Sequence, residues 1–419
     1  MNNASISIVM NGIHKCSGAC LYCSAAKSMD YRGKDNENSF KFYPDKLKAR
    51  ILEYTKDALE QGKKQDGTML SIDIWGGNPL ENFEPFKHVV DFCENELKEF
   101  KQVHLHTSGN GLELQDRDVV DYLLEHNIGY QLSHDGLGQW IRTGIIDPLY
   151  WDKTKDNIAE LVRKGKLDWV NAALSQRNPS YFANIEYFNK WRKDNNLMEC
   201  TTHNFTIKLN HIYDGTAPID KKWMFDDNPQ IKKGEVIGDL CFTGKTLQEH
   251  FHEFRKLAIM LYTPGMRENP EFAPYYNYIT GQAERYRMLK EGEVSGACVG
   301  FQTGVNKTNF AIDTKGEYCQ CNLIDSDHHV LHPSCEQPDY CKDCRYKNLA
   351  ECHPCGSEPF KDKCEWHYYW AETLEEMFQF LEYKRITESL MQNNSCKCGE
   401  HKQQRQDNQP VFCVKNYGF

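Results

Sequence analysis

The stretch Ser5-Ile-Ser-Ile-Val-Met-Asn-Gly-Ile-His-Lys-Cys16-Ser-Gly-Ala-Cys20-Leu-Tyr-Cys23 joins a strand-like run to three closely spaced cysteines. The spacing C-x3-C-x2-C gathers three sulfur ligands within eight residues. A tetrahedral structural zinc site or a four-iron cluster usually takes four protein ligands. Three cysteines therefore leave one coordination position for a distant residue or for a ligand that reacts. A zinc knuckle and chance clustering in a cysteine-rich chain are the alternative interpretations.

Composition limits the class of protein. The chain has 419 residues, enough for two or more hydrophobic cores. Its formal net charge is −10 and it has no long basic run, so we expect no nucleic-acid partner. The chain start does not resemble a signal peptide, and no apolar stretch is long enough to span a bilayer. We therefore expect a cytoplasmic protein without a membrane partner, whose 18 cysteines bind metal or act in redox chemistry rather than form disulfides.

Strand-like and helical runs alternate over the first half of the chain. Apolar residues recur at helical spacing from Pro44 to Gly62, and a second such run covers 119–126. Repeated βα units favour parallel strands with helices outside, and six units form an incomplete barrel. We therefore predict an α/β protein with a partial (β/α)6 TIM-like barrel, its strands at residues 5–10, 69–75, 103–107, 130–133, 169–174 and 205–211.

A different organisation is expected beyond the barrel. Pro218 and Pro229 mark a loop-rich connection, which is followed by a helical run over 247–262. The expected parts are a barrel core at 1–215, connecting loops and a helix at 216–295, a small cysteine-rich domain at 296–370, a helix at 371–392 and a polar tail at 393–419.

The cysteine triplet, with Tyr22 before its last member, resembles the radical S-adenosylmethionine (SAM) enzyme family. The resemblance implies a catalytic [4Fe–4S] cluster held by Cys16, Cys20 and Cys23. It implies that SAM chelates the fourth iron through its amino and carboxylate groups. The implied chemistry is reductive cleavage of SAM to methionine and a 5′-deoxyadenosyl radical, which takes a hydrogen atom from the substrate. The family's fold is also the partial barrel that the βα units predict.

Further motifs follow the predicted strands in the order that the family has. Gly76-Gly-Asn-Pro79 is similar to the family's Gly-Gly-Glu-Pro segment, with Asn in place of Glu. Thr107-Ser-Gly-Asn-Gly111 resembles its Thr-Asn-Gly turn, and Ser133-His-Asp-Gly136 resembles its Ser-x-Asp-Gly element. Binding residues of such barrels collect at the carboxyl ends of the strands. The resemblance thus implies SAM contacts from Tyr22, Gly76, Gly77, Asn78, Pro79, Ser108, Asn110, Ser133, Asp135 and Arg142.

Taken singly, several of these residues have simpler interpretations. Ser133 and Asp135 are residue types that commonly cap a turn. Arg142 is a candidate partner for the SAM carboxylate in a charge-assisted hydrogen bond, but it is equally consistent with a surface cation. The order of the motifs at successive strand ends favours the SAM site.

Nine cysteines between residues 298 and 364 form a second group. Their order resembles the SPASM domain of radical SAM peptide maturases, which implies two auxiliary [4Fe–4S] clusters. The present spacing is longer than the usual pattern between Cys344 and Cys352 and shorter between Cys352 and Cys355. A pair of zinc ribbons is the alternative. The implied ligands are Cys298, Cys321 and Cys355 for one cluster, with Cys319, Cys335, Cys241 or an open position as the fourth, and Cys341, Cys344, Cys352 and Cys364 for the other; Cys396, Cys398 and Cys413 fall outside the pattern.

The SPASM-like region implies a peptide substrate, most often a ribosomally made precursor, and a thioether or carbon–carbon crosslink or an epimer as product. Oxidation to formylglycine is disfavoured, because Asn322 stands where sulfatase-maturating relatives carry an Asp base. Since the first strand begins at about residue 5, we expect any leader to be bound by a separate protein or by the SPASM-like region and tail. We expect a flavodoxin- or ferredoxin-type protein to donate electrons. The alternatives are a small-molecule dehydrogenase acting on a sugar or alcohol, and a non-catalytic zinc or iron–sulfur protein.

Overall fold

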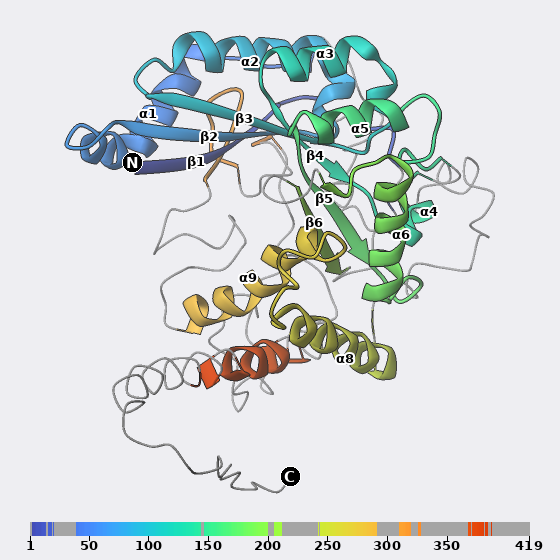
Figure 1. The fold of residues 1–419 in the computed structure, drawn as a ribbon. Coiled ribbons are helices and arrows are strands. Elements are labelled where there is room, and N and C mark those ends of the chain that lie inside the picture. Colours follow the sequence, from blue (N-terminus) through green and yellow to red (C-terminus); the bar gives the residue numbers. More distant parts are fainter. Residues whose placement is uncertain are drawn as a thin grey trace, which may run out of the picture.

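Seven parallel strands form one sheet in the part of the chain that the computed structural model describes (Figure 1). The strand order is β6-β5-β4-β3-β2-β1-β7. The strands are β1 (Asn2–Val9), β2 (Thr68–Trp75), β3 (Gln102–Gly109), β4 (Gly129–Ser133), β5 (Leu167–Leu174), β6 (Thr206–His211) and β7 (Phe310–Asp313). The described residues are 2–13, 16–18, 20, 39–143, 146–199, 205–211, 242, 244–290, 310–319, 326–327, 368–369, 371–380, 382–383 and 387.

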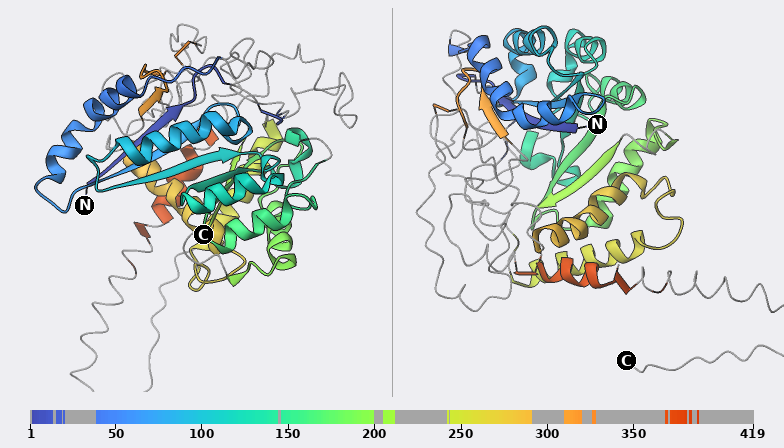
Figure 2. Two further views of the ribbon diagram at one scale, coloured as in Figure 1. Left: turned by 90° about the horizontal axis from the view of Figure 1, so that it is seen from above. Right: turned by 90° about the vertical axis from the view of Figure 1, so that its left-hand side faces the viewer.

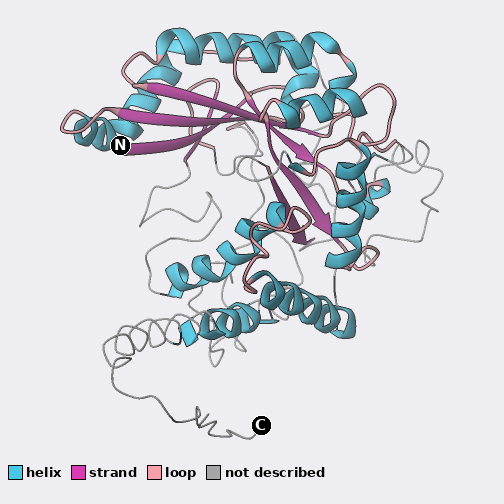
Figure 3. Ribbon diagram, viewed as in Figure 1, coloured by secondary structure: helices cyan, strands magenta, loops and turns pink. Residues whose placement is uncertain are grey.

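Helices connect the first six strands and cover the outer face of the curved sheet (Figures 2 and 3). This arrangement confirms the predicted α/β fold with a partial barrel, and each of the six predicted strands is present. The main connecting helices are α1 (Pro44–Gly62), α2 (Phe83–Glu96), α3 (Arg117–Glu125), α5 (Lys155–Arg163) and α6 (Tyr181–Asp194).

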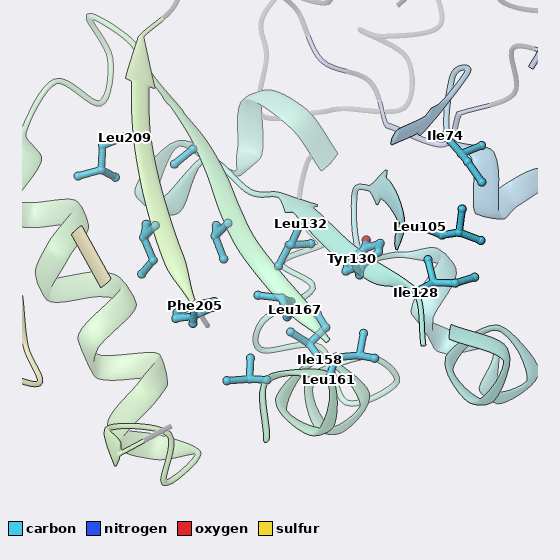
Figure 4. Close-up of a cluster of buried hydrophobic side chains, with 14 of the residues drawn as sticks. Ile74, Leu105, Ile128, Tyr130, Leu132, Ile158, Leu161, Leu167, Phe205 and Leu209 are labelled. Carbon is cyan, nitrogen blue, oxygen red and sulfur yellow. The ribbon is translucent and has the colours of Figure 1, made fainter. Parts of the chain in front are cut away.

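The hydrophobic core lies between the sheet and these helices, and Figure 4 shows part of it around β4 and β5. Leu70, Ile72 and Ile74 of β2 are fully buried on this outer face. Side chains alternate between the two faces of a strand, so the residues between them point into the barrel. The inner face carries polar residues where a parallel sheet is usually apolar. One such residue comes from each of β2 to β6: Asp73, His106, Gln131, Asp168 and Lys208.

Strand β7 extends the sheet beyond the predicted six strands. It pairs in parallel with β1, in the register Ile8 with Ile312. The turn that follows is fixed to the end of β1, because Asn11 Nδ2 donates to Asp313 Oδ2 at 2.9 Å and Asn11 N donates to Thr314 Oγ1 at 3.0 Å. Four residues give too short a pattern to predict a strand. Part of the region assigned to the cysteine-rich domain thus belongs to the barrel sheet.

Two further helices follow the barrel. Helix α8 (Gly244–Leu261) corresponds to the predicted run at 247–262, whereas α9 (Ala273–Lys290) was not predicted. Residues 371–380 are helical, as expected for the start of the predicted C-terminal helix. The rings of Phe380 and Tyr262 lie 6.1 Å apart, so this helix packs near the end of α8. Residues 216–241, which make up most of the predicted loop-rich connection, and the predicted tail at 393–419 lie outside the described residues. Among the described helices, none has the length and apolar character to cross a bilayer.

Candidate functional site

The loop after β1 brings two of the three predicted cysteine ligands together. Cys20 is buried at 6% exposure and Cys16 is partly exposed. A Cβ atom on Gly18 would lie 3.3 Å from Cys16 Sγ and 3.7 Å from Cys20 Sγ. Both sulfur atoms therefore border the same small space, which a larger residue at position 18 would fill. Cys23 and Tyr22 lie outside the described residues.

Each sulfur atom has a nitrogen donor from another strand end. Asn110 Nδ2, after β3, lies 3.9 Å from Cys16 Sγ. Arg142 Nη1, after β4, lies 3.4 Å from Cys20 Sγ. Amide and guanidinium donors stabilise negative charge on sulfur, and the thiolate is the form that binds metal. The loops after β1, β3 and β4 thus meet at the cysteines.

Asp135 holds the Arg142 side chain in place. Arg142 Nη2 donates to Asp135 Oδ1 at 2.9 Å, and the backbone N–H of Ala173 donates to the same oxygen at 3.0 Å. Asp135 is fully buried, so this ion pair is shielded from solvent. The sequence predicted both residues as SAM contacts, and the structure places them at the cysteine loop.

The Gly-Gly-Asn-Pro segment turns tightly against the end of β1. Gly76 and Gly77 have φ values of +135° and +55°, which favour glycine. Asn78, only 1% exposed, directs its Nδ2 toward two carboxylates, Glu81 and Glu113, at 2.8 Å each. Its Oδ1 is buried and accepts no hydrogen bond from the described residues. This oxygen is therefore available to accept a hydrogen bond from the amino group of a ligand.

Glu81 and Glu113 are site residues that sequence reasoning missed. Glu81 accepts hydrogen bonds from the backbone N–H of Ser17 at 2.8 and 2.9 Å. Glu113 is buried and accepts from Asn78 and from the Tyr130 hydroxyl. Burial raises the pKa of Glu113. In the sequence both look like ordinary loop carboxylates, four residues after Gly77 and two residues after Gly111, so no local signal separates them from surface charges.

The remaining predicted contacts have separate places. Pro79 begins a short 3-10 helix, Pro79–Asn82. Ser108 lies near the end of β3 opposite Gln131, and Ser133 is the last residue of β4. Cys319 is 7% exposed and packs with Val9, Ala311 and Trp75 at the edge between β1 and β7. The other predicted cluster ligands lie outside the described residues: Cys298, Cys321, Cys335, Cys341, Cys344, Cys352, Cys355 and Cys364.

A cluster of polar side chains lies on the inner face of the barrel. His106 Nδ1 lies 2.6 Å from Asp168 Oδ2, and this hydrogen bond raises the pKa of His106. Gln131 Nε2 donates to Asp73 Oδ1 at 3.1 Å, and burial raises the pKa of Asp73. Lys208 Nζ lies 3.5 Å from the centre of the Trp169 ring. Burial lowers the pKa of Lys208 to about 8.

Comparisons with known proteins give a match in fold only. No protein-family model and no curated protein matches the chain. Native anSMEcpe with bound AdoMet has a TM-score of 0.56 at 13% identity, over 90% of this chain and 99% of that chain. The same protein with AdoMet and the Cp18Cys peptide has a TM-score of 0.54 at 14% identity, over 93% of this chain and 99% of that one. With the Kp18Cys peptide the TM-score is 0.55 at 13% identity, over 92% and 99%.

Proposed function

We propose that the protein is a radical SAM enzyme that modifies a peptide. The observation that carries this proposal is the meeting of Cys16 and Cys20 at the carboxyl end of β1, with a nitrogen donor at each sulfur atom. Cys23 is the next cysteine along the same loop sequence. The fold shared with anSMEcpe, which has been solved with bound AdoMet, supports the same interpretation.

The residues present fit the cofactors of this family. Cys16, Cys20 and Cys23 would hold a [4Fe–4S] cluster. The buried Oδ1 of Asn78, which has no donor among the described residues, fits the amino group of SAM. When bound, the cluster and SAM supply a 5′-deoxyadenosyl radical that takes a hydrogen atom from the substrate.

The chain's own residues contribute orientation and exclusion of water. Gly76 lets the turn after β2 pack against the end of β1, because a Cβ atom there would lie 3.1 Å from Met10 Cβ. Gly77 adopts a φ of +55°, which favours glycine. Asp135 fixes Arg142, whose cationic group lies at Cys20 and fits the carboxylate of SAM. The polar side chains on the inner face of the barrel provide further hydrogen-bonding partners for the substrate.

A peptide substrate is supported by two kinds of observation. Native anSMEcpe has been solved with the Cp18Cys and Kp18Cys peptides. The nine cysteines after residue 298 resemble the auxiliary-cluster domain of peptide maturases. We infer a ribosomal precursor as substrate, two auxiliary [4Fe–4S] clusters, and a flavodoxin- or ferredoxin-type electron donor. A thioether, a carbon–carbon crosslink or an epimer is the proposed product.

Release of 5′-deoxyadenosine tests the radical chemistry. Protein reconstituted anaerobically with iron and sulfide is mixed with a reductant and SAM. Wild type should release 5′-deoxyadenosine, and a Cys16→Ala/Cys20→Ala/Cys23→Ala variant should not. Cys93→Ala is the matched control, because Cys93 is buried in α2 away from the site and should leave product formation intact. Equal release from wild type and the triple variant would refute the assignment.

Mass spectrometry of a co-expressed candidate peptide tests the substrate and the product. Loss of two hydrogens indicates a crosslink or desaturation, and unchanged mass with deuterium taken up from solvent indicates an epimer. Replacement of a cysteine sulfur by oxygen together with loss of two hydrogens, or loss of two hydrogens located to one serine as an aldehyde, would indicate formylglycine and would contradict the expectation from Asn322. Release of 5′-deoxyadenosine that depends on an added sugar or alcohol, with every peptide unchanged, would favour the small-molecule alternative.

A further inference from the structure

We propose that Glu81 is a positioning residue that fixes the cysteine loop to the strand ends of the barrel. The inference rests on the proposed function in one respect, namely that this loop holds a metal cluster. Glu81 belongs to the short helix after β2, whereas the loop follows β1. Contacts from Glu81 therefore join segments that lie 64 residues apart in sequence.

Donors from three different strand ends converge on the Glu81 carboxylate. The Ser17 backbone N–H donates at 2.8 and 2.9 Å, and the Ser17 hydroxyl donates at 2.6 Å. Asn78 Nδ2 donates at 2.8 Å and Asn110 Nδ2 at 3.4 Å. Asn110 also donates to Ser17 Oγ at 3.1 Å and points to Cys16 Sγ at 3.9 Å. The carboxylate thus holds the residue next to Cys16 and the amide that faces the Cys16 sulfur.

The number of donors explains why a carboxylate is needed at this position. An ionised carboxylate only accepts hydrogen bonds and has about four lone-pair sites. Asn78, Asn110 and the Ser17 hydroxyl donate to Oε1, whereas Oε2 accepts only from the Ser17 backbone N–H among the described residues. A glutamine has one accepting oxygen, and with that oxygen in the place of Oε1 its amide nitrogen would face the Ser17 N–H. A Glu81→Gln substitution therefore sets an amide N–H against the Ser17 N–H and removes the negative charge that accepts from it, at nearly constant side-chain volume.

The same network accounts for Asn78, the residue that departs from the family's Gly-Gly-Glu-Pro segment. Asn78 Nδ2 lies between the carboxylates of Glu81 and Glu113, at 2.8 Å from each. A glutamate at position 78 would bring a third negative charge to this buried place. In this chain the amide at position 78 donates to the carboxylate at position 81, and the two residues are therefore expected to depend on each other.

Three variants test the role of Glu81 in the full-length protein. Glu81→Gln removes acceptor capacity, and Ser17→Ala removes one of the donors. Glu84→Gln is the matched control, because Glu84 lies in the first turn of α2, is largely exposed at 75% and forms an ion pair only with Lys87 among the described residues. Thermal unfolding of each variant checks that the barrel remains folded.

Three readouts do not depend on turnover. Hydrogen exchange of the Ser17 amide should be roughly tenfold faster in Glu81→Gln than in wild type, since its charged acceptor is lost. Loss of the cluster to an iron chelator should be roughly tenfold faster. The electron paramagnetic resonance spectrum of the reduced cluster should change in Glu81→Gln and stay unchanged in Glu84→Gln.

The outcomes separate this inference from the proposed function. Wild-type exchange at Ser17 and wild-type cluster retention in Glu81→Gln would overturn the positioning role. A wild-type protein that binds no iron after reconstitution would overturn the proposed function, and the exchange of the Ser17 amide would still decide whether Glu81 fixes the loop.

Discussion

Arg142 Nη1 lies 3.4 Å from Cys20 Sγ, so a cation from the loop after β4 reaches the sulfur atom of a residue in the loop after β1. The second nitrogen of the same guanidinium donates to Asp135, whose side chain is fully buried. Asp135 is also bonded to the backbone of β5 through Ala173. The position of the cation is therefore set by the barrel and not by the cysteine loop.

Loss of the Arg142 cation should destabilise the protein, because Arg142 is the ion-pair partner of the buried Asp135. An Arg142→Met substitution leaves a buried carboxylate without its cation, which costs about 3 kcal/mol of unfolding free energy. An Arg142→Met/Asp135→Asn double variant should recover part of this loss, because the remaining amide is neutral. Urea unfolding of the two single variants and the double variant measures the coupling. Additive effects of the two substitutions would show that the ion pair is unimportant.

Gly129 makes room for the pair of His106 and Asp168. A Cβ atom at position 129 would lie 2.0 Å from Asp168 Oδ2 and 2.5 Å from His106 Nδ1. Gly129→Ala should therefore push the pair apart, with an overpacking cost of about 2 kcal/mol. In an Asp168→Ala background the carboxylate overlap is gone and the His106 ring is no longer held by Asp168, so it can turn away and the same substitution should cost less. An equal cost in both backgrounds, measured by denaturant unfolding, would mean that the overlap is relieved elsewhere.

Much of the fold could be predicted from local patterns. The run from Met69 to Trp75 alternates on a strand period before a glycine pair, and a helical run between Pro44 and Gly62 precedes it. Strand β7 could not be predicted, since its four residues are defined by pairing with β1. The positions of Cys16, Asn78, Asn110 and Asp135 at successive strand ends followed from the order of the strands.

The carboxylates of the site could not be predicted in the same way. Glu81 reaches Ser17 only because the barrel brings the ends of β1 and β2 together. Glu113 is buried by Tyr130 and Asn78, which lie 17 and 35 residues away in sequence. A glutamate in a polar loop has no sequence pattern that separates burial from exposure. Hydrogen-bond partners that are so distant in sequence can be identified only from the folded structure.

Lys208 should make stability depend on pH in the alkaline range. Burial lowers its pKa in the folded protein from 10.5 to about 8. Between these values the unfolded chain binds more protons than the folded one, so the unfolding free energy should rise with pH across this window. A Lys208→Met variant lacks this contribution, and the difference between wild type and variant should change from pH 8 to about 10.5. Parallel pH profiles of the two proteins would contradict the burial of this ammonium group.

Asn78→Asp tests the charge balance at the buried carboxylates with an almost unchanged shape. The new carboxylate would face Glu81 and Glu113, each of which accepts a 2.8 Å hydrogen bond from the native amide. Repulsion and burial should raise the pKa of the aspartate in the folded protein above its unfolded value of about 3.9. The folded variant then binds more protons than the unfolded chain, so its stability relative to wild type should be greatest at low pH and fall as pH rises through the folded pKa. Denaturant unfolding of both proteins from pH 4 to 8 measures the difference, with the exposed Asn95→Asp in α2 as the matched control. A constant difference between Asn78→Asp and wild type across this range would mean that the side chain at 78 does not lie between two carboxylates.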